Sequence, residues 1–136
     1  MILCDSNGAV IFAACRQLTN CGDALEAELA AMEEGLSLAL HWMTEAIVLE
    51  SDSAEAIKLV NEASPNCSRH AMRIKVIRDN FREREITIVK VSRDANAASH
   101  GLAFLGRVQG RTGLWLQDYP PDIAVTIIDE CTLPVN

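Results

Sequence analysis

Short apolar runs separated by polar turns predict the strands of this chain. Residues 1–4 and 9–16 flank Asp5-Ser-Asn-Gly8, which is typical of a tight hairpin turn because Asn-Gly readily adopts positive φ. Residues 46–49 form an apolar run that is too short for a helix and predicts a strand buried on both faces. Residues 86–91 are mostly β-branched, which favours a further strand. The chain is therefore expected to begin with a hairpin and to continue with single strands.

Apolar residues that recur every three or four positions predict helices between these strands. Asp23-Ala-Leu-Glu26 has the form of a capping box and opens a long amphipathic helix. Further helices are expected over residues 53–60, from about Ser68 onward, and up to about Val108. The pattern of residues 122–128 fits a strand or a short helix equally well. A hairpin followed by strands that alternate with helices predicts an α/β fold with a mixed sheet.

Two carboxylates occupy positions that suit a functional site. Glu28 projects from the edge of the apolar stripe of the long helix, where a carboxylate is costly unless it is paired, protonated or bound to a metal. Its aliphatic stem can also simply carry the charged head out to solvent. Asp52 ends a strand at the edge where α/β sheets usually bind ligands, but Asp52 with Glu55 also matches a helix-capping box. These patterns leave both alternatives open for each residue.

Charge and cysteine content narrow the class of protein further. The 136 residues are expected to form one domain, and the net charge of −7 argues against tight electrostatic capture of nucleic acid. However, eight of the twelve Lys and Arg residues fall between Arg69 and Arg93, so this stripe is either a solvated helix face or a binding surface. Five cysteines without a Cys-x-x-Cys pair predict reduced thiols. With no secretory signal or membrane-spanning run, an intracellular protein of the cytoplasm or nucleus is expected.

Four short motifs, in order and at workable spacing, resemble those of plant reverse-transcriptase-like ribonuclease H domains. Asp5-Ser-Asn-Gly8 is similar to the family's Arg-Asp-x-x-Gly hairpin, here without the Arg. Ala27-Glu28 is similar to an Ala-Glu helix motif, and Glu50-Ser-Asp52 to a Glu-Ser-Asp strand end. Arg93-Asp-Ala-Asn96, followed by Ser99-His100-Gly-Leu-Ala103, resembles Arg-x-x-Asn-x-x-Ala-Asp-x-Leu-Ala. The resemblance spans nearly the whole chain and implies a ribonuclease H-like mixed sheet flanked by helices.

The resemblance implies two-metal cleavage of the RNA strand of an RNA–DNA hybrid. Mg²⁺, or Mn²⁺ in its place, is bound by carboxylate oxygens; one ion activates the attacking water and the other stabilises the departing 3′ oxygen. On this interpretation Glu28 and Asp52 are the metal ligands and catalytic acids. His100 stands where the family has its last catalytic Asp. Its imidazole can ligate a softer ion or shuttle a proton, but it brings no negative charge.

Two departures from the family pattern predict that hydrolysis is crippled or lost. The family's first Asp lies in a strand before the hairpin, and no residue of this sequence occupies that position. Asp5 is expected to be a turn residue rather than a substitute for that Asp. With His100 at the last position, only two carboxylates remain, and two carboxylates are expected to bind Mg²⁺ weakly or not at all.

The absent first strand is central in the family's sheet, so its loss predicts a gap lined by unpaired backbone groups. The segment Ile123–Ile128, the same segment of a second copy, or a strand of another protein is expected to fill it. Residues 1–113 are expected to form the abbreviated ribonuclease H-like domain. Residues 114–136 are expected to form a tail that packs on it or completes it.

Three functions are compatible with these patterns. The first is an RNA–DNA hybrid ribonuclease. The second, which we favour, is a catalytically impaired domain that binds an RNA–DNA hybrid or RNA. The third is a non-catalytic module that captures a protein partner or a second copy through an open sheet edge. No membrane partner is expected. For the second function, the nucleic-acid-binding residues are expected to be Arg69, Arg73, Arg82, Arg93 and Asn96.

Overall fold

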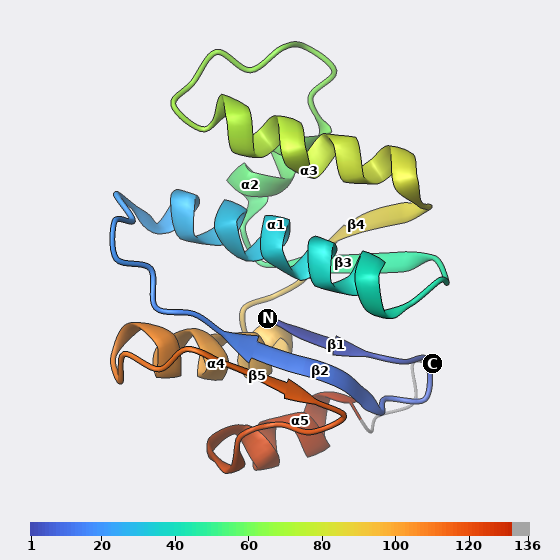
Figure 1. The fold of residues 1–136 in the computed structure, drawn as a ribbon, viewed down its shortest axis with the longest axis vertical. Coiled ribbons are helices and arrows are strands. Elements are labelled where there is room, and N and C mark those ends of the chain that lie inside the picture. The colour runs from blue at the N-terminus through green and yellow to red at the C-terminus, as the bar shows by residue number, and fades with distance from the viewer. Residues whose placement is uncertain (132–136) are drawn as a thin grey trace. The chain divides into compact units, whose positions relative to one another are not determined.

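The computed structural model describes residues 1–131, in which short strands alternate with helices (Figure 1). None of the helices in this part of the chain is long and apolar enough to cross a membrane. The elements in chain order are β1 (Ile2–Cys4), β2 (Val10–Cys15), α1 (Ala24–Trp42), β3 (Ile47–Ser51), α2 (Ala54–Asn61), α3 (Ala71–Glu83), β4 (Ile86–Lys90), the 3₁₀ turn η1 (Asp94–Asn96), α4 (Ala97–Arg107), β5 (Gly113–Leu116), the 3₁₀ turn η2 (Pro121–Ile123) and α5 (Ala124–Cys131).

The chain divides into two compact units, each with its own sheet. Unit 1 contains residues 1–19 and the chain from Ser92 onward, and unit 2 contains Asn20–Val91. The strands of unit 1 are hydrogen-bonded in the order β1-β2-β5, and those of unit 2 form the pair β3-β4. The predicted α/β class is confirmed, with antiparallel pairing at the start of the chain and parallel pairing in the middle.

The hairpin of unit 1 confirms the predicted turn. The carbonyl of Asp5 accepts a hydrogen bond from the backbone N–H of Gly8 at 3.0 Å, and Gly8 has a φ of +83°. The Asp5 carboxylate also accepts from the N–H groups of Asn7 and Ala9, which fixes the turn locally. Strand β5 pairs antiparallel with the other edge of β2, so residues from the C-terminal part of the chain complete a three-stranded sheet.

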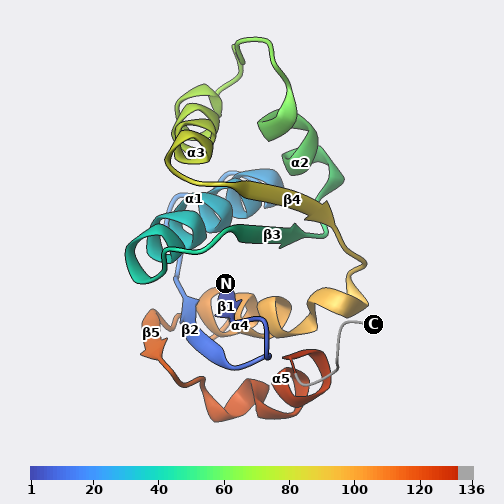
Figure 2. The same cartoon turned by 90° about the vertical axis from the view of Figure 1, so that its right-hand side faces the viewer.

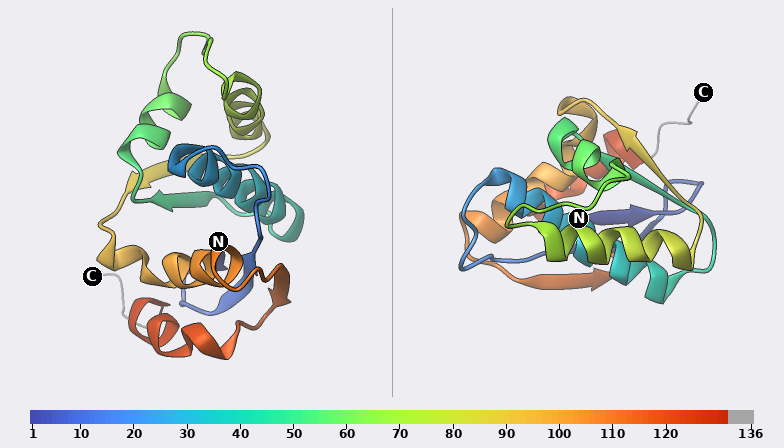
Figure 3. Two further views of the ribbon diagram at one scale, coloured as in Figure 1. Left: turned by 90° about the vertical axis from the view of Figure 1, so that its left-hand side faces the viewer. Right: turned by 90° about the horizontal axis from the view of Figure 1, so that it is seen from above.

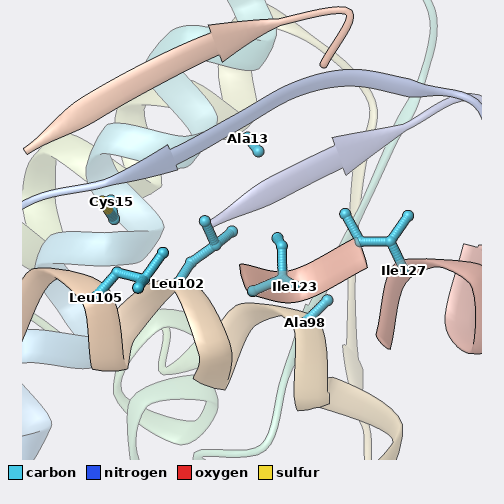
Figure 4. Packing of buried hydrophobic residues seen from close by; sticks show 7 residues of the cluster. All are labelled: Ala13, Cys15, Ala98, Leu102, Leu105, Ile123 and Ile127. Carbon is cyan, nitrogen blue, oxygen red and sulfur yellow. The ribbon is translucent and has the colours of Figure 1, made fainter. Parts of the chain in front are cut away.

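The C-terminal part of unit 1 is helical and packs on α4. Ile123 and Ile127 enter a buried cluster, whereas Val125 is 74% exposed. In a strand Val125 would share the buried face, so only a helix satisfies this burial. The expectation that Ile123–Ile128 fills a strand position is therefore wrong. The cluster is shown in Figure 4 and consists of Ala13, Cys15, Ala98, Leu102, Leu105, Ile123 and Ile127.

Unit 2 consists of the parallel pair β3-β4 and helices α1, α2 and α3 (Figure 2). Helix α1 packs against α3, and Leu29 and Leu36 of α1 and Ile74 and Ile77 of α3 are fully buried. In β3 buried and exposed residues alternate, and Val48 is 61% exposed. The prediction that this strand is buried on both faces is therefore wrong, because Val48 and Glu50, which share one face of the strand, are exposed.

Candidate functional site

Glu28 lies in the second turn of α1, and a side-chain cap sets the start of that helix. The N-cap residue is Asp23, whose carboxylate accepts a hydrogen bond from the backbone N–H of Glu26 at 2.8 Å. The Glu26 carboxylate in turn accepts from the backbone N–H of Gly22 at 2.7 Å. The predicted Asp23 cap is confirmed, but Glu26 reaches back to the N–H of Gly22 and not to that of the N-cap residue, as it would in a standard capping box. Glu28 itself is half-buried and precedes the fully buried Leu29, as expected at the edge of the apolar stripe.

The cap residue Asp23 also forms an ion pair with Arg69, from the segment that precedes α3. The hydrogen bond from the Glu26 backbone lowers the pKa of the Asp23 carboxyl, and the Arg69 guanidinium lowers this pKa further. Both partners stabilise the ionised form, as does the positive end of the α1 dipole. Ionised Asp23 therefore ties the start of α1 to the start of α3 within unit 2.

The substitution Asp23→Asn is expected to destabilise the protein in a pH-dependent way. The pKa of Asp23 in the folded state lies below the ordinary Asp value of 3.8. The stabilisation that ionised Asp23 gives the folded state is therefore fully present above pH 3.8 and is lost as the pH falls through the folded-state pKa. Asn still accepts the capping hydrogen bond but does not titrate. Urea unfolding from about pH 6 to about pH 2 should show wild type more stable than Asp23→Asn, with a difference that shrinks on acidification. A difference that is independent of pH would contradict this assignment.

Asp52 directly follows β3, and it is not the residue that caps the next helix. The N-cap of α2 is Ser53, whose hydroxyl accepts a hydrogen bond from the backbone N–H of Ala56 at 3.2 Å. The capping interpretation of Asp52 is therefore wrong, because β3 extends to Ser51 and the helix begins one residue later than the pattern suggested. Asp52 is half-buried at the carboxyl end of the parallel pair, where ligands of α/β sheets bind.

The start of α1 and the end of β3 lie at the same end of unit 2. Only residues 43–46 connect the two elements, so α1 and β3 run in opposite directions, as Figures 1 and 3 show. Glu28 lies about 21 Å from the end of α1 at 1.5 Å per residue. Asp52 lies about 17 Å from the start of β3 at 3.3 Å per residue. Both distances are measured from the ends that residues 43–46 connect. Because the two distances are similar, Glu28 and Asp52 lie toward the same end of unit 2.

Three further predicted site residues lie in unit 1, where α4 begins. Arg93 precedes the turn η1 and is exposed, and Asn96 ends this turn and is the N-cap residue of α4. His100 lies in the first turn of α4 and is half-buried. The predicted catalytic set of Glu28, Asp52 and His100 is therefore divided between the two units.

Most of the predicted nucleic-acid-binding arginines have acidic partners. Besides the pair with Asp23, Arg73 lies 3.3 Å from a carboxylate oxygen of Glu33, and Arg82 lies 3.6 Å from one of Asp79. Arg82 is the most exposed of these three arginines, with 84% of its side chain accessible. Ion pairs between exposed side chains are worth about 0–1 kcal/mol, so a phosphate can replace such a partner.

A comparison with known protein families identifies the family of this chain. The family model described as reverse transcriptase-like matches residues 1–105, from β1 through most of α4. The chain belongs to the reverse transcriptase-like family. Domains of this family are ribonuclease H-like, in agreement with the α/β elements described above. No curated protein and no solved structure matches the chain significantly. The match ends before β5 and α5, which are therefore features of this reverse transcriptase-like chain outside the matched range.

The described donors of the reverse transcriptase-like chain do not fit a preformed metal site. Within residues 1–131, no group of three or more His, Cys, Asp and Glu side chains is arranged to hold a metal ion. Mg²⁺ takes about six oxygen ligands in near-octahedral geometry, and two carboxylates supply only part of such a set.

Two residues with structural roles in the reverse transcriptase-like domain carry no sequence signal. The Arg78 guanidinium of α3 donates hydrogen bonds to the carbonyls of Leu59 at 2.6 Å, Val60 at 3.1 Å and Ser64 at 3.0 Å, and so holds the end of α2. In unit 1, the Glu130 carboxylate accepts from backbone N–H groups of α4. Neither role is readable from periodicity, because the partners lie at least 14 residues away along the chain.

Proposed function

We propose that this chain is a plant-type ribonuclease H-like domain that binds RNA–DNA hybrid or RNA and has impaired hydrolytic activity. The observation that carries the proposal is the family match over residues 1–105. In that range, two half-buried carboxylates, Glu28 and Asp52, lie toward the same end of unit 2. By the family resemblance, His100 would stand in place of a third. The fold and the acidic positions support an origin as a hybrid-binding domain, and the reduced acid set supports the loss of cleavage.

The acidic residues are proposed to have a reduced metal-binding role. Glu28 and Asp52 would hold a divalent cation only together with oxygens of the nucleic acid, since the described protein groups do not complete a ligand set. When bound, Mg²⁺ or Mn²⁺ would neutralise phosphate charge beside the two carboxylates. A histidine at position 100 brings no carboxylate oxygen to this set. Binding is therefore expected to depend weakly on the cation.

The basic residues are proposed to supply most of the affinity. Phosphates contacted by Arg and Lys release condensed counterions, and this release gives steeply salt-dependent binding. Arg82 and Arg93 are exposed and suit direct phosphate contact, and Asn96 lies next to the first turn of α4. Arg69 and Arg73 would exchange an acidic partner for phosphate. The aromatic content of 4% gives little support for base stacking, so we expect backbone rather than sequence recognition.

A fluorescent RNA–DNA hybrid tests the proposal in both respects. Anisotropy should show binding that weakens steeply with salt, and gel analysis in Mg²⁺ and in Mn²⁺ should show no cleavage above background. Glu28→Gln and Asp52→Asn should bind the hybrid as well as wild type or better, because each removes a negative charge that repels phosphate. Glu55→Gln is the matched control, since Glu55 is exposed in the first turn of the neighbouring helix α2.

Each part of the proposal has its own contradictory result. Metal-dependent cleavage that disappears in Glu28→Gln and Asp52→Asn but persists in Glu55→Gln would show a working nuclease. Absence of binding to hybrid and to RNA at low salt would remove the nucleic-acid role. A complex of defined stoichiometry with another protein, indifferent to Mg²⁺, would then favour the interaction-module alternative.

A further inference from the structure

The turn between β1 and β2 contains two adjacent residues that can react with each other. Asn7 is exposed and is followed by Gly8, and no other asparagine of the sequence precedes a glycine. A glycine has no side chain to shield its backbone nitrogen, so this nitrogen can closely approach the side-chain amide of the preceding asparagine. The pair Asn7–Gly8 is therefore the place in this chain where such an approach meets the least steric resistance.

The reaction is an intramolecular deamidation that needs only water and hydroxide. Hydroxide removes the proton of the Gly8 N–H, and the nitrogen attacks the side-chain carbonyl carbon of Asn7. A new carbon–nitrogen bond forms, the bond to the side-chain NH₂ group breaks, and this group leaves as ammonia after taking a proton from water. Water then opens the succinimide ring at either carbonyl, which leaves an aspartyl or isoaspartyl residue in place of Asn7. Because the two groups belong to adjacent residues, no second molecule has to be bound before the ring closes.

In the folded hairpin the attacking nitrogen is engaged in a hydrogen bond. The Gly8 N–H donates to the carbonyl of Asp5 at 3.0 Å, so the proton that the reaction must remove is held there. The Asp5 carboxylate accepts from the N–H groups of Asn7 at 2.8 Å and Ala9 at 2.9 Å. Together these bonds hold the backbone of the turn in one conformation. Ring closure requires the Gly8 nitrogen to rotate away from the Asp5 carbonyl, so the hydrogen bonds of Asp5 oppose the reaction.

The strand that leads into this turn is short, so the turn can open without unfolding unit 1. Strand β1 contains only Ile2–Cys4, and its register with β2 shifts between Leu3 and Cys4. Short, irregular segments open at a lower free energy than the core. Strand β2, in contrast, also pairs with β5, and its residues Phe12–Cys15 are buried. Opening of the turn therefore requires the loss of only a few hydrogen bonds.

We propose that Asn7–Gly8 is a deamidation site that the hydrogen bonds of Asp5 protect and that opening of the turn makes reactive. The isoaspartyl product adds a methylene group to the backbone between positions 7 and 8, so the turn cannot restore its original hydrogen bonds. The modification therefore proceeds in one direction and accumulates in chains whose turn has opened. It is independent of the proposed function, because no nucleic acid takes part.

The full wild-type chain, kept in mildly alkaline buffer with and without guanidinium chloride, tests the site and its protection. Trypsin releases residues 1–16, in which Asn7 is the only residue with a side-chain amide. Mass spectrometry of this peptide should detect the exchange of an amide for a carboxyl group at position 7. We expect this exchange to be at least roughly tenfold slower in native buffer than in denaturant. Equal rates would overturn the protection, and absence of the product in denaturant would overturn the site itself.

The variant Asp5→Ala tests whether this turn is the protecting element. It removes both hydrogen bonds of the Asp5 carboxylate, so deamidation in native buffer should be roughly fivefold to thirtyfold faster than in wild type. The matched control is Ser6→Ala, which changes the exposed neighbour of Asp5 and should react at the wild-type rate. In denaturant all three proteins should react at similar rates, because no turn remains. A native rate of Asp5→Ala equal to that of wild type would contradict protection by Asp5.

A second measurement on wild type serves if circular dichroism shows that Asp5→Ala is unfolded. Guanidinium chloride is then added in steps below the unfolding transition, and the deamidation rate is compared with the helical signal. The rate should rise before the helical signal falls, because the turn opens locally. A rate that rises only together with the loss of helix would show that global unfolding, and not opening of the turn, exposes Asn7.

Discussion

Replacing Leu102 with Ala is expected to lower the free energy of unfolding by about 2–5 kcal/mol. Leu102 is completely buried in the cluster that joins α4 to β2 and to the C-terminal segment. Removing its isobutyl group loses apolar burial and leaves a cavity whose walls are held by three different elements. The neighbours are therefore poorly placed to collapse into the space.

Urea unfolding followed by circular dichroism measures this loss, and Phe104→Ala is its matched control. Phe104 lies two residues further along the same helix, but 47% of it is exposed. Truncating Phe104 removes less buried apolar surface than truncating Leu102. Phe104→Ala should therefore lower the free energy of unfolding clearly less than Leu102→Ala does. A larger loss for Phe104→Ala would show that the buried face of α4 differs from the one described.

The substitution Gly106→Ala is expected to destabilise the protein by about 1–3 kcal/mol, although Ala is intrinsically the better helix former. A Cβ atom at Gly106 would lie 2.7 Å from the backbone carbonyl oxygen of Arg16 and 3.1 Å from its carbon. Arg16 directly follows β2, so relief of this clash requires the helix to move away from the strand. That movement would disturb the packing of Leu105, which is buried beside Gly106.

Gly101→Ala on the same helix is the control for Gly106→Ala. Its new Cβ would also meet an atom at 2.7 Å, but that atom is the Cγ2 methyl of Ile123 rather than backbone. A side-chain methyl moves at lower cost than a strand, so Gly101→Ala should lose less stability in the same thermal or urea measurement. Equal losses for the two variants would contradict the backbone origin of the Gly106 effect.

Features that depend on neighbouring residues were predictable from the sequence. The Asp5–Gly8 turn and the Asp23 cap are formed by groups within four positions of each other, so their residue types suffice to identify them. The α2 cap could not be assigned from the sequence because Asp52 and Ser53 are both good N-cap residues. Only the extent of β3, which ends at Ser51, decides between them.

Features that depend on distant contacts could not be predicted. The segment after Asp122 was ambiguous because its apolar residues suit either period, and its burial against α4 selects the helix. Arg78 looked like one more member of a basic stripe, but its guanidinium is occupied by three backbone carbonyls. For the candidate site, the resemblance to the family motifs was the sequence signal that pairs Glu28 with Asp52. Their chemical roles stay a prediction.

The discontinuous course of unit 1 has a consequence for how the protein emerges from the ribosome. Unit 2 is one continuous segment, Asn20–Val91, and its strands and helices can associate as soon as that segment is synthesised. Strand β2, in contrast, is made early, but its partner β5 follows roughly one hundred residues later. Until β5 is synthesised, β2 has an unpaired, apolar edge. We therefore expect chaperones to bind this edge during translation.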